Sequence, residues 1–253
     1  MKIQQSGCTY RPSPSFEVSR NKAGVLESVP FKKILSYWGQ LGFQDGCSLS
    51  IYLLIIFHNF ALMLLIGVIR LVVLWFYVLF STNLTRHLFF DFQGLEIFWT
   101  VVPGLVIYLL AVPSLYVLYY LEESVESFFS YKVVGNQWYW SYSLPEFGVF
   151  FDSYIKRWGR GGDYRCLDVD YSLLIPLITS VRILVTRRDV IHCWAVPSLG
   201  VKVDGVPGRI NQLDIKLSLG GIFFGQCSEI CGVNHRMMPI CIEGVRVDDI
   251  FML

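Results

Sequence analysis

Residues 97–120 read IFWTVVPGLVIYLLAVPSLYVLYY, a run of 24 residues without a charged side chain. Glu96 precedes this run, and Glu122 and Glu123 follow it. A helix of this length rises about 36 Å, which is enough to cross the ~30 Å hydrocarbon core of a bilayer. The run therefore predicts a transmembrane helix.

A second apolar run precedes it at residues 60–80 and contains one charged residue, Arg70. The connector, residues 81–94, is short, so the two spans are predicted to form a helical hairpin with both chain ends on one side of the membrane. The alternative is a pair of buried helices in a soluble core, but uncharged runs of about 18 or more residues usually span a membrane. A charge near mid-membrane costs ~2.5 kcal/mol or more, so Arg70 is expected to face a partner subunit or to snorkel.

The composition divides the chain into three parts. The whole chain is 54% hydrophobic and only 16% charged, whereas soluble domains are about 25% charged. Its formal net charge of +1 argues against a strongly basic surface, so no nucleic acid is expected as a partner. Residues 1–40 are rich in Lys, Arg and Ser and resemble an organellar presequence, with a retained disordered tail as the alternative. We assign residues 41–121 to the transmembrane hairpin and residues 122–253 to a separate domain.

The third part has the pattern of an all-β domain. Short segments rich in Val, Ile, Leu, Tyr and Trp alternate with Gly, Pro, Asp and Asn after Glu126. This pattern predicts a β-sandwich or a barrel. The predicted strands are residues 131–134, 137–143, 181–186, 213–217 and 221–224.

The most informative motif is GQCSEICGVNHRMM at residues 225–238. Cys227 and Cys231 are four residues apart, His235 is four further on, and Met238 is three beyond that. Two thiolates, an imidazole and a thioether form a soft donor set, which suits copper better than zinc. Two thiolates can bridge two copper ions, so the motif favours a binuclear, mixed-valence site over a mononuclear electron-transfer site.

Such a site needs a second imidazole, and His192 is the candidate. Two other histidines lie in or beside the apolar spans. His192 follows the predicted strand 181–186 and is expected on a loop at the end of the sandwich. The alternatives are a packed or surface histidine at this position, and a disulfide between the two motif cysteines. The remaining five cysteines have no ligand partners at metal spacing, and we interpret them as packing residues or free thiols.

A second unusual stretch is GNQWYWSYS at residues 135–143. On a strand, Trp138 and Trp140 would point to one face and Tyr139 to the other. These rings are explained either as ordinary core packing or as exposed aromatic groups near a redox centre. In the second case they offer a contact surface and an entry point for electrons.

The chain resembles the cytochrome c oxidase subunit 2 family, part of the haem–copper terminal oxidases of mitochondria and aerobic bacteria. The resemblance implies a two-helix transmembrane hairpin followed by a cupredoxin-like β-sandwich. It starts at Leu41 and covers about 210 of the 253 residues. The motifs that carry it are LGFQD (41–45), EIFWTVVPG (96–104), VPSLYVLYYLEE (112–123), QWYWSY (137–142), FDSY (151–154), DVIHCWAVPSLGVKVDGVPGRINQ (189–212) and CSEICGVNHRMMPI (227–240).

The resemblance also implies roles for individual residues. The Glu229 carboxylate would bind a magnesium ion shared with subunit 1. Trp138 would receive the electron from cytochrome c. Glu96 would lie near the mouth of a proton pathway, with a simple flanking charge at a helix end as the alternative. The binuclear copper centre, CuA, would be held by His192, Cys227, the backbone carbonyl of Glu229, Cys231, His235 and Met238.

The function implied is that of the electron-entry subunit of the oxidase. It would pass electrons from cytochrome c to haem in subunit 1, where oxygen reduction is coupled to proton pumping. Its partners would be cytochrome c, subunit 1, the other oxidase subunits and membrane lipid. Its location would be the mitochondrial inner membrane, with both termini and the copper domain in the intermembrane space. A membrane-anchored copper-delivery or storage protein is the alternative, and it has no need of Trp138 or Glu229.

The charges near the aromatic motif differ from the pattern of the family. SLPEFG offers one acid, Glu146, and Arg187 and Arg188 precede Asp189. The attraction of a basic cytochrome is therefore expected to be weaker or shifted.

Overall fold

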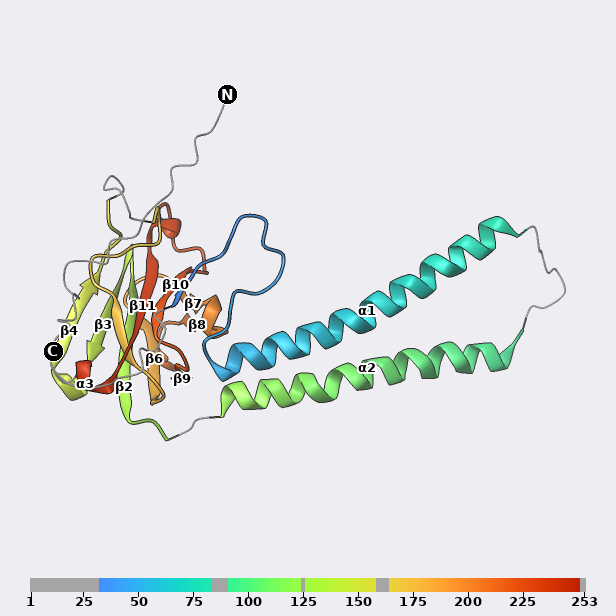
Figure 1. Cartoon of the computed structure of the whole chain (residues 1–253), viewed down its shortest axis with the longest axis horizontal. Coiled ribbons are helices and arrows are strands. Elements are labelled where there is room, and N and C mark those ends of the chain that lie inside the picture. The colour runs from blue at the N-terminus through green and yellow to red at the C-terminus, as the bar shows by residue number, and fades with distance from the viewer. Residues whose placement is uncertain (1–31, 83–90, 124–125, 158–163, 251–253) are drawn as a thin grey trace, which may run out of the picture. The chain divides into compact units, whose positions relative to one another are not determined.

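The computed structural model describes residues 32–82, 91–123, 126–157 and 164–250. The chain forms two compact units (Figure 1). The hairpin unit comprises residues 52–123, and the sandwich unit comprises the segment up to Ile51 together with the chain from Ser124 onward. Each unit is described by itself.

Two long helices, α1 (Leu49–Ser81) and α2 (Gln93–Glu122), make up the hairpin. Each contains one of the predicted spans and extends it at both ends. The most apolar 18-residue window is 0% buried in α1 and 6% buried in α2. The helices of a soluble core would be mostly buried, so that alternative does not hold. Pro103 and Pro113 lie inside α2, where neighbouring membrane helices can satisfy the freed carbonyl groups.

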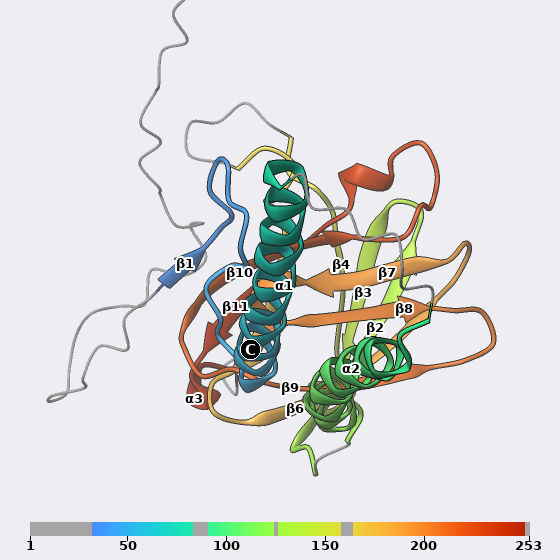
Figure 2. The ribbon, with the colours of Figure 1, turned by 90° about the vertical axis from the view of Figure 1, so that its right-hand side faces the viewer.

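Two β-sheets form the sandwich unit. The strands are β1 (Lys32–Ile34), β2 (Phe129–Asn136), β3 (Tyr139–Leu144), β4 (Val149–Ser153), β5 (Leu173–Pro176), β6 (Ser180–Arg187), β7 (His192–Val196), β8 (Val201–Gly205), β9 (Asn211–Lys216), β10 (Gly221–Cys227) and β11 (Pro239–Val245). One sheet has the order β5-β11-β10-β7-β8, with β1 beside β10, and the other has the order β4-β3-β2-β6-β9 (Figure 2). Short helical turns are η1 (Pro145–Phe147), η2 (Pro197–Leu199), η3 (His235–Met237) and α3 (Val247–Ile250).

The core lies between the two sheets. Tyr131 and Val133 alternate along β2 with less buried residues, and Ile183 lies fully buried on β6. The largest fully buried side chains are those of Trp140 on β3 and Trp194 on β7. Alternation of this kind is typical of a sheet with one face in the core. The structure therefore confirms the predicted transmembrane hairpin followed by a β-sandwich.

The strand positions differ from prediction in two ways. Four of the predicted strands coincide with β2, β6, β9 and β10, but Gln137 and Trp138 form the turn between β2 and β3. Trp138 therefore does not lie on a strand with Trp140, and the prediction that both rings point to one face of a strand does not apply to it. Several strands were not predicted, among them β7 and β11. β7 is buried along its whole length, and β11 along most of it. Strands of this kind lack the alternating pattern that reveals a half-buried strand.

Residues on the N-terminal side of α1 are built into the sandwich unit. β1 pairs in parallel with β10, from Lys32 opposite Gly221 to Ile34 opposite Phe223. β7 pairs with β10 only at the C-terminal end of β10, at Gln226 and Cys227. The backbone at the start of β10 is therefore open to pairing with β1. The prediction of a presequence falls mostly on residues 1–31, which lie outside the described residues.

The segment just before α1 is tied to the same unit by hydrogen bonds. The N–H of Cys47 donates to the carbonyl of Ser198 over 3.1 Å, and the N–H of Ser218 donates to the carbonyl of Cys47 over 2.9 Å. The hydroxyl of Ser48 donates to the carbonyl of Leu199 over 2.6 Å. The sandwich is thus completed by residues that precede the membrane helices in the chain.

Candidate metal centre

The loop between β10 and β11 carries most of the predicted ligands. β10 ends at Cys227, β11 begins at Pro239, and the two strands remain paired as far as Gln226 and Pro239. The backbone N–H of Cys227 donates to the carbonyl of Met238 over 3.3 Å, which closes the loop. The CSEICGVNHRMM motif is therefore a hairpin loop whose two ends bring Cys227 and Met238 together.

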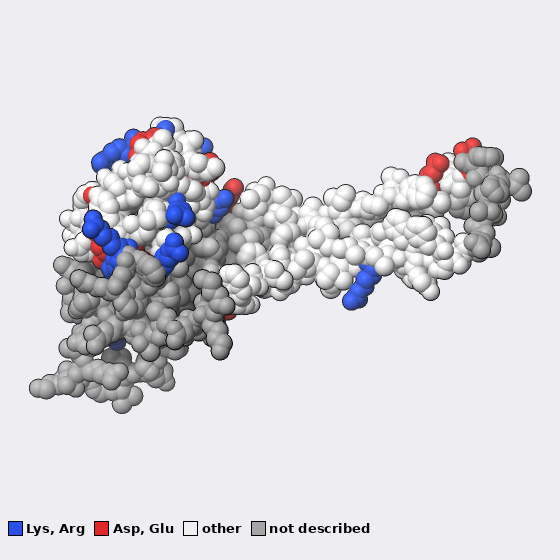
Figure 3. Space-filling view, turned by 90° about the horizontal axis from the view of Figure 1, so that it is seen from above, with Lys and Arg blue, Asp and Glu red and all other residues white. Residues whose placement is uncertain are grey.

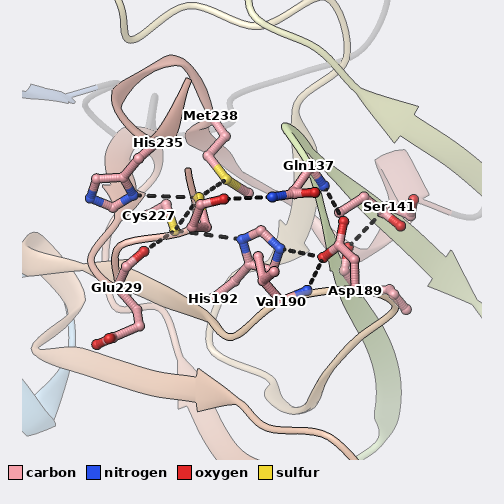
Figure 4. A network of polar contacts seen from close by, with 12 residues as sticks. Gln137, Ser141, Asp189, Val190, His192, Cys227, Glu229, His235 and Met238 are labelled. Atoms are coloured by element: carbon pink, nitrogen blue, oxygen red, sulfur yellow. Dashed lines mark hydrogen bonds and ion pairs between the residues drawn. The ribbon is translucent and has the colours of Figure 1, made fainter. Parts of the chain in front are cut away.

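The donor atoms of five predicted ligands converge at this loop (Figure 4). The Sγ of Cys231 lies 3.5 Å from Nδ1 of His235 and 3.5 Å from Sδ of Met238. The Sγ of Cys227 lies 4.0 Å from Sγ of Cys231 and 3.9 Å from Nδ1 of His192. Both cysteines are free thiols, so the disulfide alternative is not realised. The site presents three sulfur and two imidazole donors, which can hold metal ions once the thiols lose their protons.

His192 reaches the site from the first position of β7, a strand rather than the expected loop. Its Nε2 lies 2.7 Å from Oδ1 of Asp189, which leaves Nδ1 facing Cys227. The Asp189 carboxylate also accepts the backbone N–H groups of Gln137 over 2.6 Å and Val190 over 2.7 Å. A carboxylate behind a ligand histidine fixes the ring and raises its basicity. This role of Asp189 was not predicted, although its position three residues before His192 is a usable signal.

Two residues of the facing sheet hold the His192 ring in place. The Trp140 ring lies edge-on to it at a centroid distance of 5.9 Å. The Trp140 Nε1–H donates to the carbonyl of Met238 over 3.4 Å, so the same indole also touches the hairpin loop. A Cβ atom at Gly135 on β2 would lie only 2.8 Å from Cδ2 of His192. Only glycine leaves room for the ring at this position.

We expect Gly135→Ala to weaken metal binding by about 10- to 100-fold, the range found for substitutions behind metal ligands. The added methyl group would push the His192 ring away from the sulfur atoms, because the strand backbone around Gly135 cannot retreat. Competition titration with a copper chelator measures the affinity. Gly42→Ala is the matched control, since its added methyl group meets nothing within 4 Å. Equal affinities of the two variants would contradict this account of Gly135.

The cluster makes its two thiols unequal in acidity. Burial raises the pKa of Cys227, but hydrogen bonds from His192 and from backbone groups outweigh burial and lower this pKa to about 7. Burial and the neighbouring charge on Cys227 raise the pKa of Cys231 above its usual value. Burial lowers the pKa of His192, but its bonds to Cys227 and Asp189 prevail and raise it overall. Without metal, these contacts therefore favour ionisation of Cys227 and protonation of His192 relative to the free side chains.

In the metal-free protein, we expect one thiolate to form near pH 7 and the next only well above it. The lowered pKa of Cys227 means that its thiolate predominates above that pH and takes up a proton below it. The ultraviolet absorbance of the thiolate, followed against pH, measures this step. Cys227→Ser should remove the step, whereas Cys166→Ser, which alters a half-exposed thiol outside the cluster, should leave it. A titration without a step between about pH 6 and pH 8 would refute the assignment.

Glu229 presents its backbone and its side chain to different surroundings. Its carbonyl oxygen lies 3.4 Å from Sγ of Cys227. Its exposed side chain points away from the sulfur atoms (Figure 4). The two roles expected of this residue, a carbonyl ligand and a carboxylate for a second metal, are therefore compatible in one conformation.

Trp138 packs directly on the hairpin loop between β10 and β11. The indole is half-buried, and a Cβ atom at Gly232 would approach its Cζ2 to 3.1 Å. Gly232 follows Cys231 and has a φ of +124°, a conformation that favours glycine. The side-chain amide of Gln137 donates to the carbonyl of Cys231 over 2.8 Å and ties the same turn to the loop. The role of Gln137 was not predicted, because nothing in its spacing marks a residue that bonds to a backbone carbonyl 94 positions away.

Glu96 is not part of this cluster. It lies in the first turn of α2, in the hairpin unit. It borders a shallow hollow with Gln93, Ile97, Thr100 and Val101. Among the described residues, the remaining cysteines are free thiols outside the cluster, as expected: Cys47, Cys166, Cys193 and Cys241.

Fold and site together define a class of protein: a β-sandwich anchored by two membrane helices, with a buried site of thiols, imidazoles and a thioether. Two family profiles match the chain. "Cytochrome C oxidase subunit II, periplasmic domain" covers residues 129–245, and "Cytochrome C oxidase subunit II, transmembrane domain" covers residues 36–117.

Individual relatives agree with these profiles. Cytochrome c oxidase subunit 2 of Apis koschevnikovi is 43% identical over 210 residues, which are 83% of this chain and 93% of the relative. The same subunit of Drosophila melanogaster is 44% identical over 217 residues, 85% of this chain and 95% of the relative. A crystal structure of the periplasmic domain of subunit II of cytochrome oxidase from Bradyrhizobium japonicum is 38% identical. It covers 51% of this chain and 93% of its own, with a TM-score of 0.48.

The chain belongs to the cytochrome c oxidase subunit 2 family and is a subunit of a haem–copper oxidase. The family and the fold predicted from the sequence are therefore confirmed. The alternative of a copper-delivery or storage protein is not favoured.

Proposed function

We propose that the cluster holds a binuclear copper centre and that this chain is where cytochrome c delivers electrons to the oxidase. The convergence of His192, Cys227, Cys231, His235 and Met238 carries the proposal. Thiolate, thioether and imidazole donors suit copper, and two adjacent thiolates would let the site hold two ions. The carbonyl of Glu229 would complete the ligand set. The bound copper would supply one-electron redox chemistry.

The residues of the chain prepare this site in three ways. Asp189 fixes the His192 ring so that Nδ1 faces the sulfur atoms. The core excludes water, since Cys231 and Met238 are only 2% and 1% exposed. The strands on both sides hold the loop, so the ligands need to move little when an electron arrives or leaves.

Trp138 would be the entry residue for the electron, which would then pass to haem in subunit 1. Its contact with Gly232 supports this role, because the half-buried indole then lies beside the backbone that follows the proposed ligand Cys231. Arg187 and Arg188 lie near the turn, so this surface would attract a basic cytochrome less strongly than a uniformly acidic surface would.

Two carboxylates outside the copper site would have roles that involve other subunits of the oxidase. The exposed Glu229 side chain would bind magnesium together with subunit 1, since hard oxygen ligands suit a hard cation. Glu96 would lie near the mouth of a proton pathway, which its exposed place at the start of α2 supports. The complex would reside in the mitochondrial inner membrane, with the sandwich unit and both termini in the intermembrane space. The apolar surface of the hairpin would contact lipid and neighbouring subunits.

Electron paramagnetic resonance of the copper-loaded chain tests the binuclear centre. The complete chain in detergent is the right sample, because the segment before α1 forms part of the sandwich. One electron shared between two copper nuclei gives a seven-line pattern, and we expect this pattern, lost on treatment with a strong chelator. A four-line pattern, or no signal after oxidation, would contradict the proposal.

A further inference from the structure

Arg70 interrupts the apolar surface of the hairpin. It is the single Asp, Glu, Lys or Arg residue in the α1 sequence, and its side chain is exposed. Figure 3 shows one basic group on the otherwise uncharged middle of the hairpin surface. A charge in such a place is costly and usually marks a contact or a function.

Snorkelling to the lipid headgroups would stabilise the Arg70 charge only poorly. Arg70 is the central residue of the apolar segment 60–80, which by itself matches the thickness of a bilayer core. Ten residues separate it from either end, and they span about 15 Å along the helix axis. With the bilayer centred on this segment, a snorkelling side chain would have to cross about half of the hydrocarbon core to reach the headgroups, which is costly.

The described part of this chain does not supply a counter-charge either. No hydrogen bond or ion pair engages the Arg70 side chain there. In α2 the acids are confined to the ends, at Glu96 in the first turn and Glu122 at the last position. Within the described residues no acid neutralises Arg70, and a neighbouring polypeptide of the complex could supply one.

The helix surface around Arg70 is suited to a close neighbour. Met63, Gly67 and Leu74 lie on the same side of α1, at helical spacings of three and four residues. Met63 and Leu74 are 61% and 59% exposed, and a Cβ atom at Gly67 would meet nothing within 4 Å. Small residues in membrane helices let a second backbone approach closely. A helix packed on Gly67 would thus lie within reach of the guanidinium group one turn away.

We infer that this surface, formed by Met63, Gly67, Arg70 and Leu74 and called the Arg70 face, docks a transmembrane helix of another oxidase subunit. Arg70 pairs there with a carboxylate near the middle of the membrane. The guanidinium fork matches a carboxylate with two parallel hydrogen bonds, and the dry surroundings strengthen this pair. The inference rests on membership of a multisubunit oxidase and not on the copper site.

Substitutions of Arg70 in the intact oxidase test the inference. The amount of this chain that stays with the solubilised complex is measured on native gels. We expect Arg70→Lys to keep most of it, Arg70→Leu to lower it about tenfold, and Arg70→Glu to abolish it. A lipid-facing Arg70 gives the opposite sign, since Arg70→Leu would then improve or preserve retention. That result would overturn the inference.

A relocated arginine controls for charge and membrane insertion. The double variant Arg70→Leu with Val72→Arg keeps one arginine in the span but places the charge on the opposite side of α1. It should fail to restore retention, and full recovery would show that the face is irrelevant. The copper signal per chain should be unchanged in every variant. This separates a lost subunit contact from a damaged sandwich or an incorrect copper assignment.

Discussion

Cys231→Ser is expected to abolish the binuclear copper signal and to lower cytochrome c-driven turnover by more than ~100-fold. Substitutions behind metal ligands already change affinity by about 10- to 100-fold, so the loss of the thiolate proposed to bridge two copper ions should exceed that range. Cys231 is central to the cluster, with His235, Met238 and Cys227 all within 4.0 Å of its Sγ. A serine hydroxyl is a hard donor that keeps its proton at neutral pH, so it could not replace a thiolate in the proposed two-copper centre.

The result needs a control for folding, because Cys231 is only 2% exposed. Serine is close to cysteine in size, so circular dichroism should show an intact sandwich. Cys241→Ser is the matched control, since Cys241 is also buried, at 6% exposure, but lies on β11 outside the donor cluster. This variant should keep the binuclear signal. A Cys231→Ser protein that retains the seven-line pattern would show that one thiolate suffices.

The sequence predicts those parts of the site that lie close together in the chain. Cys227, Cys231, His235 and Met238 come from one loop, so their spacing alone places their donor atoms near each other. His192 was found because few histidines remained as candidates, but its position at the start of a strand was missed. β7 is buried on both faces, and its residues carry no alternation that marks a strand.

The residues that hold the ligands in place could not be predicted in the same way. Gln137 and Gly135 act through contacts between segments that are distant in the sequence, and these contacts depend on the register of the strands. Asp189 is different, because it bonds to His192 only three residues away. Gly135 lies opposite Trp140 in the β2–β3 pair and beside the His192 ring. A sequence pattern reports the period of a strand, but not which residue of a distant strand lies across from it.

The hairpin was predictable because it depends on local composition and not on contacts between distant strands. Its helices are defined by their own composition, because each must satisfy its backbone polar groups internally within the membrane. Residues 32–48 show the limit of this reasoning. They precede a membrane helix in the sequence, yet β1 and Cys47 bond to strands and loops near the other end of the chain.

Trp138→Phe is expected to slow the entry of electrons from cytochrome c by about tenfold or more, which corresponds to ~1.4 kcal/mol of activation free energy. The half-buried indole packs against Gly232, which follows the proposed ligand Cys231. A phenyl ring is smaller and leaves a gap there, and electron tunnelling weakens steeply with distance. The copper spectrum should not change, because Trp138 is not a ligand.

Kinetic constants distinguish electron entry from docking. If Trp138 conducts the electron, kcat should fall while KM stays close to its original value, since the phenyl ring still presents an apolar surface to the partner. A higher KM with the same kcat would instead make Trp138 a docking residue. Trp38→Phe is the matched control, because Trp38 is fully exposed and makes the same chemical change on the same chain. An unaltered rate in Trp138→Phe would mean that electrons enter elsewhere. The stacked pair Tyr139 and Tyr154, with ring centroids 4.5 Å apart, would then be the next residues to replace.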